Sequence, residues 1–236
     1  MTAANRVPKE RYYDADFYRL ECERLWTRAW QMACRLEEIK KPGDYVVYDI
    51  LDQSVIVTRV DANTIKAYHN SCRHRGVRLA DDRGNRRNGF LCPFHGWTWN
   101  LQGENTFLYE PRLFAQENLD PADLRLREVR CELWGGCAFI NFDHNAPPLR
   151  ESIEPFASYN DGRNHAAMQL DWWHAVELPT NWKLAMEAFM EGYHVMQTHP
   201  QLVPEAGRGE AAVYADSVGR GHGMVDRKAA QSQRHG

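Results

Sequence analysis

The sequence predicts an α+β fold, in which a small antiparallel β domain precedes a second domain that begins with helices. Short runs rich in Val, Ile and Tyr, separated by turn residues, occupy the segment between about residues 43 and 143. Helical patterns lie on either side of it, at residues 14–30 and 181–197. With 43% hydrophobic and 26% charged residues, the 236-residue chain has the composition of a globular protein with a sizeable core.

The helix predicted over residues 14–30 is amphipathic. Asp14 is a suitable N-cap, because its short side chain can accept a hydrogen bond from a backbone N–H of the first turn. Apolar side chains recur at the spacing of one buried helix face, at Cys22, Leu25, Trp26, Ala29 and Trp30. We expect Cys22 to lie in the core. Cys34, which has no partner at metal-ligand spacing, is interpreted in the same way.

The β domain is predicted from strand-like runs that follow the Pro42–Gly43 turn. These runs cover residues 45–51, 54–60, 64–69, 97–101 and 137–142. The segment Asn145-Ala-Pro-Pro148 is expected to be a linker that ends the domain. After it we expect a short helix over 149–158, an aromatic segment over 170–178 and the helix over 181–197.

These patterns divide the chain into three parts. Residues 1–42 form an N-terminal helical segment that packs on the second domain, residues 43–148 form the β domain, and residues 149–236 form the start of the second domain. The sequence has no internal repeat that would indicate a solenoid.

Charge and hydropathy exclude several classes of function. The net charge is −3, from 29 basic and 32 acidic residues, so we expect no nucleic-acid partner. The arginines between Arg73 and Arg87 are interpreted mainly as a solvated loop. No apolar run approaches the about 20 residues that span a membrane, and the N-terminus lacks the apolar core of a signal peptide. We therefore expect a cytoplasmic protein, in which the six cysteines have metal-binding or structural roles rather than forming disulfides.

One motif indicates a metal cluster. It reads Cys72-Arg-His74, then seventeen residues, then Cys92-Pro-Phe-His95. Two Cys and two His could bind one zinc ion, but zinc fingers usually group Cys with Cys and His with His. Here each half supplies one thiolate and one imidazole, which suits a Rieske [2Fe–2S] centre, where two Cys hold one iron and two His the other. A zinc site and a coincidental spacing are the alternatives.

The residues around the four candidate ligands favour the cluster. Gly76 and Gly96 would let the backbone approach the sulfur atoms closely. Pro93 would stiffen the second loop, and Trp97 would shield the site from water and so tune its reduction potential.

A second candidate metal site lies in the helix predicted over residues 181–197. Glu187, Glu191 and His194 share one helix face at spacings i, i+4 and i+7, which alone is also typical of a solvated surface. His199 would point about 140° away from His194 on an unbroken helix. Pro200 disfavours helical geometry at His199, so the helix should end there and bring the two imidazoles together. Two histidines at such a break suit a two-His-one-carboxylate iron(II) site with open positions for oxygen.

The stretch SCRHRG…LCPFHGWTWNLQGE closely resembles the Rieske domain of ring-hydroxylating oxygenase α subunits. The flanking segments YYDADFYRLECERLWTRAWQ and GGCAFINFDHNAPPL extend the resemblance, which runs to about residue 202. It implies a Rieske [2Fe–2S] cluster and a mononuclear iron(II) as cofactors. It also implies that the second domain is the start of a helix-grip-like catalytic domain.

The resemblance also implies roles for individual residues. Cys72, His74, Cys92 and His95 would hold the cluster, and His194 and His199 would bind the mononuclear iron. Glu191 would link a cluster histidine of a neighbouring subunit to an iron-ligand histidine; the family usually has Asp there. Asn181, Glu187 and Trp97 are expected to support the sites without binding metal. The third iron ligand of the family lies far downstream of residue 236, so we expect the sequence to be truncated.

The activity implied is that of a terminal oxygenase. It would receive electrons from NAD(P)H through a ferredoxin or reductase and use O₂ to hydroxylate or dihydroxylate a small apolar substrate. An aromatic substrate is favoured, with methyl or quaternary amine oxidation as the alternative. A homotrimer, possibly with a β subunit, is implied. An iron–sulfur electron carrier or a non-catalytic fragment without a complete iron site is the competing hypothesis.

Overall fold

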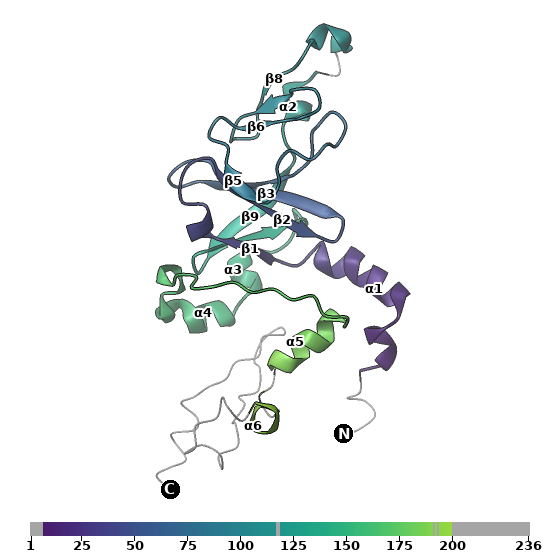
Figure 1. The fold of residues 1–236 in the computed structure, drawn as a ribbon, viewed down its shortest axis with the longest axis vertical. Coiled ribbons are helices and arrows are strands. Elements are labelled where there is room, and N and C mark those ends of the chain that lie inside the picture. The colour runs from purple at the N-terminus through teal and green to yellow at the C-terminus, as the bar shows by residue number, and fades with distance from the viewer. Residues whose placement is uncertain (1–6, 117–118, 191, 193, 200–236) are drawn as a thin grey trace. The chain divides into compact units, whose positions relative to one another are not determined.

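The computed structural model describes residues 7–116, 119–190, 192 and 194–199 (Figure 1). The chain forms two compact units. One comprises residues 21–152 and 163–169 and contains the strands. The other comprises the described residues of 1–20, 153–162 and 170–236.

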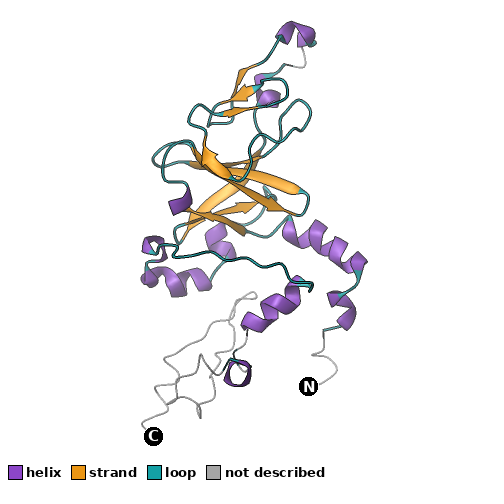
Figure 2. Cartoon of the chain, in the orientation of Figure 1, coloured by secondary structure: helices purple, strands orange, loops and turns teal. Residues whose placement is uncertain are grey.

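Two antiparallel sheets form the strand-rich unit (Figure 2). The larger has seven strands in the order β1 (Gln31–Arg35), β10 (Cys137–Asn141), β9 (Glu128–Trp134), β4 (Ile65–His69), β3 (Gln53–Arg59), β2 (Asp44–Ile50) and β5 (Arg83–Asn85). The smaller consists of β6 (Phe90–Leu91), β7 (Thr98–Trp99) and β8 (Asn105–Phe107). Neighbouring strands pair in antiparallel fashion in both sheets, which confirms the predicted small antiparallel β domain and the α+β class.

The interior strand β3 contributes to two hydrophobic cores. Ile56 belongs to one core and Val55 and Val57 belong to the other, because successive side chains of a strand point to opposite faces of the sheet. All three side chains are fully buried, because both faces of this strand are covered by a core. This explains why residues 55–57 are apolar without alternating polar positions. The core that includes Ile56 also contains the candidate ligands Cys72 and Cys92, so the cluster motif is part of the packed interior.

Tyr68 connects the two sheets. It lies in β4, and its fully buried hydroxyl donates a hydrogen bond of 3.0 Å to the carbonyl of Leu101, which follows β7. Burial raises the pKa of the phenol well above its usual range, so the hydroxyl stays protonated as a donor. On the side of the smaller sheet, the indole of Trp99 donates to the carbonyl of Leu124 at 2.7 Å. These two bonds fix the smaller sheet relative to the core on which it packs.

The predicted strands at 45–51, 54–60, 64–69, 97–101 and 137–142 correspond to β2, β3, β4, β7 and β10. The sequence patterns did not reveal β1, β5, β6, β8 or β9. β5, β6 and β8 have only two or three residues each, too few to show a pattern, whereas β9 alternates charged with apolar side chains and was missed although this is a strand pattern. β1 has a register shift between Met32 and Cys34, which interrupts the two-residue period on which the prediction depends.

The N-terminal helix is shorter than predicted. α1 covers Ala15–Glu21, and the chain continues as a π-helical turn over Cys22–Trp26. Asp14 is confirmed as the N-cap, since its carboxylate accepts the N–H of Phe17 at 2.8 Å. The predicted buried face was wrong for Leu25, which is exposed, and Cys22 is only half buried, because the wider π-turn changes the spacing along the face. Cys34 is buried, as predicted.

The other helices are short. In the strand-rich unit they are η3 (Cys22–Trp26, the π-helical turn), η4 (Leu36–Glu38), η5 (Pro111–Leu113), α2 (Pro121–Leu124), α3 (Leu149–Ser152) and η8 (His165–Ala167). The other unit contains η2 (Lys9–Tyr12), α4 (Phe156–Asn160), α5 (Trp182–Met190) and α6 (Val195–Thr198), and η7 (Asp161–Arg163) spans the boundary between the units. The helix predicted over 149–158 is thus two helices, separated at Pro155, and the one predicted over 181–197 is α5 and α6. Among the helices described, none is long and apolar enough to span a bilayer.

The N-terminal segment contacts α5 within its own unit. The hydroxyl of Tyr12 donates a hydrogen bond of 2.7 Å to the carboxylate of Glu187, and this bond raises the pKa of the phenol. The ammonium of Lys183 lies 5.8 Å from the centre of the Tyr12 ring and 5.4 Å from that of Phe17. These contacts agree with the proposal that the N-terminal segment packs on the second domain; the three domain boundaries stay a proposal.

Replacing Tyr68 by Phe tests the connection between the sheets. The change removes the buried hydroxyl donor and leaves the carbonyl of Leu101 without it, so we expect the free energy of unfolding to fall by about 1–2 kcal/mol. Chemical denaturation followed by circular dichroism measures this change. Tyr13→Phe, at an exposed position, is the matched control and should have no effect. Equal stability of the two variants would contradict the role assigned to Tyr68.

Candidate metal centres

The four predicted cluster ligands lie on two loops that have the same backbone hydrogen bonds. The first loop follows β4, and the N–H of Cys72 donates to the carbonyl of Val77 at 2.8 Å. The second connects β6 and β7, and the N–H of Cys92 donates to the carbonyl of Trp97, also at 2.8 Å. In each loop the carbonyl of the cysteine accepts the N–H of the glycine four residues later, at 2.9 Å and 3.0 Å. The two halves of the motif therefore fold as copies of one small turn.

The glycine of each loop is required by backbone conformation. Gly76 has φ = +72° and Gly96 has φ = +71°, values in the left-handed region that side chains with a Cβ disfavour. A Cβ at Gly96 would meet no protein atom within 4 Å, and one at Gly76 would meet only the hydroxyl of Ser71, at 3.7 Å. The positive φ therefore explains both glycines, and the predicted close approach to sulfur stays a prediction.

The two loops bring like ligands together. Nδ1 of His74 lies 3.2 Å from Nδ1 of His95, and Cys92 is close enough to Cys72 to contribute to the raised pKa of the Cys72 thiol. A two-iron cluster with one Cys-ligated and one His-ligated iron requires this pairing of thiol with thiol and imidazole with imidazole. The donor set and its arrangement therefore fit a Rieske [2Fe–2S] group.

The thiol pair and the imidazole pair differ in exposure. Cys72 and Cys92 are 4% and 2% exposed, whereas both histidines are partly exposed. Burial raises the pKa of the Cys72 thiol, an effect that the backbone N–H of His74 opposes. Burial and the adjacent His95 lower the pKa of His74, which favours the neutral imidazole that a metal ligand requires.

Aromatic rings cover the imidazole pair. Trp97 stacks on His74 with 4.9 Å between ring centres and an angle of 11° between planes. Phe114 meets the same imidazole edge-on at 5.7 Å, and Phe94 lies 4.0 Å from His95 between ring centres. Trp97 is buried, in agreement with the predicted shielding role. Phe114 lies far from the motif in the sequence, and no spacing rule could have indicated its contact with His74.

Asn70 holds the first ligand loop closed. Its carboxamide oxygen accepts the N–H groups of Leu79 and Ala80, both at 3.0 Å. Its nitrogen donates to the carbonyl of Ala80 at 2.7 Å and to the hydroxyl of Ser54 at 3.1 Å. The side chain is buried and therefore joins both ends of the loop to β3. Sequence reasoning missed this residue; a polar side chain at the end of an apolar strand, two residues before a ligand, was the available signal.

The predicted iron segment begins with a capped helix. The side-chain oxygen of Asn181 accepts the N–H of Lys183 at 3.0 Å, so Asn181 starts α5. Glu187 is exposed on α5 and accepts the hydroxyl of Tyr12. Both contacts are structural ones, and the supporting role of these two residues at an iron site stays a prediction. Glu191 lies outside the described residues, so its bridging role stays a prediction.

His194 and His199 lie at the two ends of α6. Their ring centres are 5.5 Å apart, with an angle of 76° between planes. His199 has φ = −125° and ψ = 55°, so the helix ends there, as the following proline predicts. The break brings the two imidazoles together, although an unbroken helix would separate them. In the part of the chain that the structure describes, no third His, Cys, Asp or Glu side chain joins these two histidines in a group that could hold a metal ion. Iron ligation by these histidines therefore stays a prediction.

Comparison with known proteins matches both parts of the chain. The family model of the Rieske [2Fe-2S] domain matches residues 29–111. The model of the ring hydroxylating alpha subunit (catalytic domain) matches residues 164–236. The two matches include all six predicted metal ligands.

The similar proteins include dioxygenase and monooxygenase subunits, whose names indicate different substrates. The chain is 33% identical to the chlorobenzene dioxygenase subunit alpha of Cupriavidus sp. (strain PS12), over 83% of this chain and 44% of that one. It is 27% identical to the carnitine monooxygenase oxygenase subunit of Acinetobacter baumannii, over 82% and 52%. Among solved structures, the quaternary ammonium Rieske monooxygenase CntA with L-carnitine superimposes with a TM-score of 0.77 at 26% identity, over 88% of this chain and 58% of that one. The chain thus spans about half the length of the curated relatives it matches.

Replacing Asn70 by Ala tests whether this residue fixes the first ligand loop. The change leaves the buried N–H groups of Leu79 and Ala80 without an acceptor, so we expect a loss of about 2–3 kcal/mol in the free energy of unfolding and a lower iron content. Denaturation and iron analysis measure the two effects. Asn63→Ala, at an exposed turn, is the control. A variant with unchanged stability and full iron would show that the loop closes without Asn70.

Proposed function

Because the chain belongs to the Rieske ring-hydroxylating oxygenase α-subunit family, we propose that it is the electron-accepting part of a terminal oxygenase. The observation that carries the proposal is the pairing of Cys72 with Cys92 and of His74 with His95 on two matching loops. These four residues would hold a [2Fe–2S] cluster, which supplies one-electron storage. His194 and His199 would hold iron(II), which supplies the binding and activation of O₂.

The residues of the chain would have distinct tasks around these groups. The two loops bury the cysteine ligands and so keep water from them, while Trp97 and Phe114 orient the imidazole of His74. Glu191 would hydrogen-bond an iron-ligand histidine and a cluster histidine of a neighbouring subunit. The two imidazoles of the proposed iron site lie 5.5 Å apart between ring centres, because the helix ends at His199. A ferredoxin or NAD(P)H-dependent reductase would supply the electrons, and the working form would be a homotrimer.

We propose an aromatic compound as the substrate. Supporting this choice, the relative that acts on an aromatic compound has the higher identity, 33% against 27%. The second candidate is a quaternary ammonium compound, which is favoured by the similarity to the carnitine monooxygenase subunit and by a glutamate at the bridging position. Turnover assays that offer an aromatic hydrocarbon and carnitine in parallel distinguish the two.

Iron and sulfide analysis distinguishes the oxygenase from a simple electron carrier. We expect three irons and two sulfides per chain, since the cluster contributes two irons and the second site one. Cys92→Ser removes a cluster ligand and should abolish the visible absorption of the oxidised protein, whereas Cys22→Ser, outside both loops, should retain it. Two irons and two sulfides in the unaltered chain would favour the electron carrier, and visible absorption in Cys92→Ser would contradict the cluster assignment.

Replacing His194 by Ala tests the second site. We expect the loss of one iron per chain with the cluster absorption unchanged, because His194 lies outside both cluster loops. NAD(P)H-dependent oxygen uptake with an added reductase should fall to the background rate. His144→Ala, which changes an exposed histidine, is the matched control. Full iron content and uptake in His194→Ala would exclude the proposed iron ligand.

A further inference from the structure

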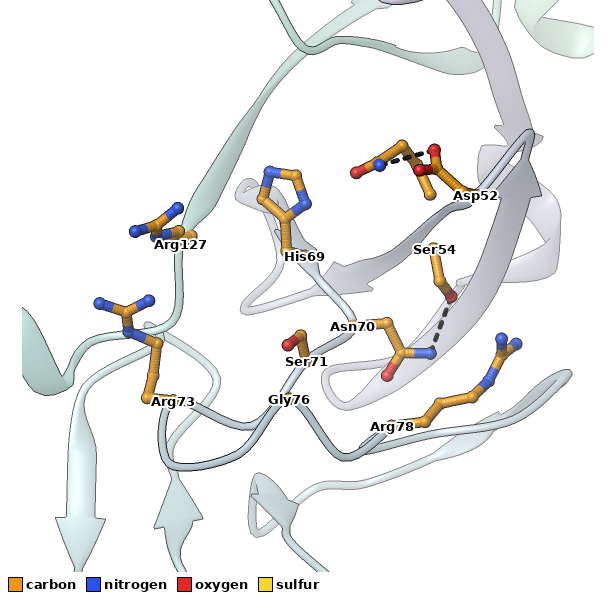
Figure 3. Close-up of a pocket in the computed structure, with 10 residues that line it drawn as sticks. Asp52, Ser54, His69, Asn70, Ser71, Arg73, Gly76, Arg78 and Arg127 are labelled. Atoms are coloured by element: carbon orange, nitrogen blue, oxygen red, sulfur yellow. Dashed lines mark hydrogen bonds between the residues drawn. The ribbon is translucent and has the colours of Figure 1, made fainter.

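An open cleft of about 480 Å³ borders the first ligand loop (Figure 3). Its lining is mainly polar and includes residues from three parts of the strand-rich unit: Asp52, His69, Ser71, Arg73, Arg78 and Arg127. Figure 3 shows the guanidinium groups of Arg73 and Arg127 on the same side of the cleft, away from Asp52. The cleft therefore has a strongly basic side, although the net charge of the chain is −3.

The arginines of the cleft differ in how their charge is compensated. Arg78 forms ion pairs with Asp49 at 2.9 Å and with Asp81 at 2.8 Å. Arg73 donates from Nε to the backbone carbonyl of Asp123 at 2.9 Å, which fixes its position without neutralising it. Within the described ranges, neither Arg73 nor Arg127 has a carboxylate at ion-pair distance, and Arg127 is exposed. Two guanidinium charges are thus available to an acidic ligand.

The first ligand loop lines the cleft and also carries two of the proposed cluster ligands. Arg73 stands in the sequence between the ligands Cys72 and His74, and Gly76 of the same loop lines the cleft. On the other side, the N–H of His69 donates to the carbonyl of Arg127 at 2.9 Å, which ties Arg127 to the strand that enters the ligand loop. A molecule bound in the cleft would therefore contact the loop that carries Cys72 and His74.

We propose that this cleft docks the acidic surface of a one-electron donor protein, whose carboxylates bind Arg73 and Arg127. The proposal rests on the proposed function. Cys72 and Cys92 are 4% and 2% exposed, so a donor protein can approach them only across a loop. The uncompensated positive charge of Arg73 and Arg127 would steer an acidic partner to the loop that carries Arg73. In each encounter the donor is oxidised by one electron and the cluster is reduced by one. Complexes of this kind are small and weak, so a few charges can decide where they form.

The docking test measures binding directly. The probe is an acidic plant-type [2Fe–2S] ferredoxin, titrated calorimetrically into the full chain at low salt and at about 0.15 M ionic strength. Arg73→Glu/Arg127→Glu reverses both charges and should weaken binding at low salt by at least about tenfold, and it should remove most of the salt dependence. Arg86→Glu makes the same change at an exposed position outside the cleft and should stay within about twofold of the unaltered chain.

A second measurement separates docking from damage to the loop. With NADPH and a ferredoxin reductase as the electron supply, the ferredoxin-dependent loss of visible absorption should slow by a similar factor in the double variant. Reduction by dithionite should not change. Arg127→Glu alone, which leaves the ligand loop unaltered, should also slow the ferredoxin-dependent reduction, by a smaller factor than the double variant.

Three results would overturn the proposal. One is unchanged ferredoxin affinity in the double variant. Another is a loss of ferredoxin affinity in Arg86→Glu as large as that in the double variant, which would indicate a general charge effect. The third is binding of inorganic phosphate that depends on Arg73 and Arg127 while ferredoxin binding does not, which would make the cleft a small-anion site. A chain that binds ferredoxin through these arginines but has no cluster absorption would contradict the proposed function and leave the docking surface in place.

Discussion

The strand-rich unit depends on the meeting of two loops at one end of a packed core. The loops are copies of one turn, each closed by a hydrogen bond from its cysteine N–H and each with a glycine at positive φ. Cys72 and Cys92 belong to the same core as Tyr68 and Trp99, so the ligand geometry is fixed by the packing that stabilises the domain. Any change that loosens this core should therefore also displace ligands, and cluster binding should in turn stabilise the fold.

The sequence predicted the site better than it predicted the sheet. Ligand spacing is local, and each loop closes on itself, so the motif alone was enough to identify the thiol and imidazole pairs. The sheet depends on pairing between distant strands, and the irregular register of β1 hides its period of two, whereas β9 shows that period and was missed. Contacts such as that of Phe114 with His74 arise only when the chain is folded. The break at His199 was predictable because proline acts on the residue immediately before it.

The arginines between Arg73 and Arg87 illustrate the limit of composition as a guide. They were interpreted mainly as a solvated loop, and for two of them this is adequate, since Arg78 and Arg83 are exposed and pair with nearby carboxylates. Arg73 differs because its Nε is held by a backbone carbonyl. A net charge of −3 therefore coexists with a local positive site beside the ligand loop, which the composition alone does not reveal.

The unequal exposure of the two ligand pairs suggests a direction for electron flow. The imidazoles of His74 and His95 are the accessible ends of the site and can hydrogen-bond a group outside the domain, as the proposed link through Glu191 requires. The thiols are closed off by the loop that carries Arg73, and electrons reaching them from the cleft would cross that loop. Electrons that enter beside the thiols and leave through the imidazoles would cross different surfaces of the domain. A donor in the cleft would then leave the histidine side free, so in the proposed homotrimer the domain could be reduced while the histidines face a neighbouring catalytic domain.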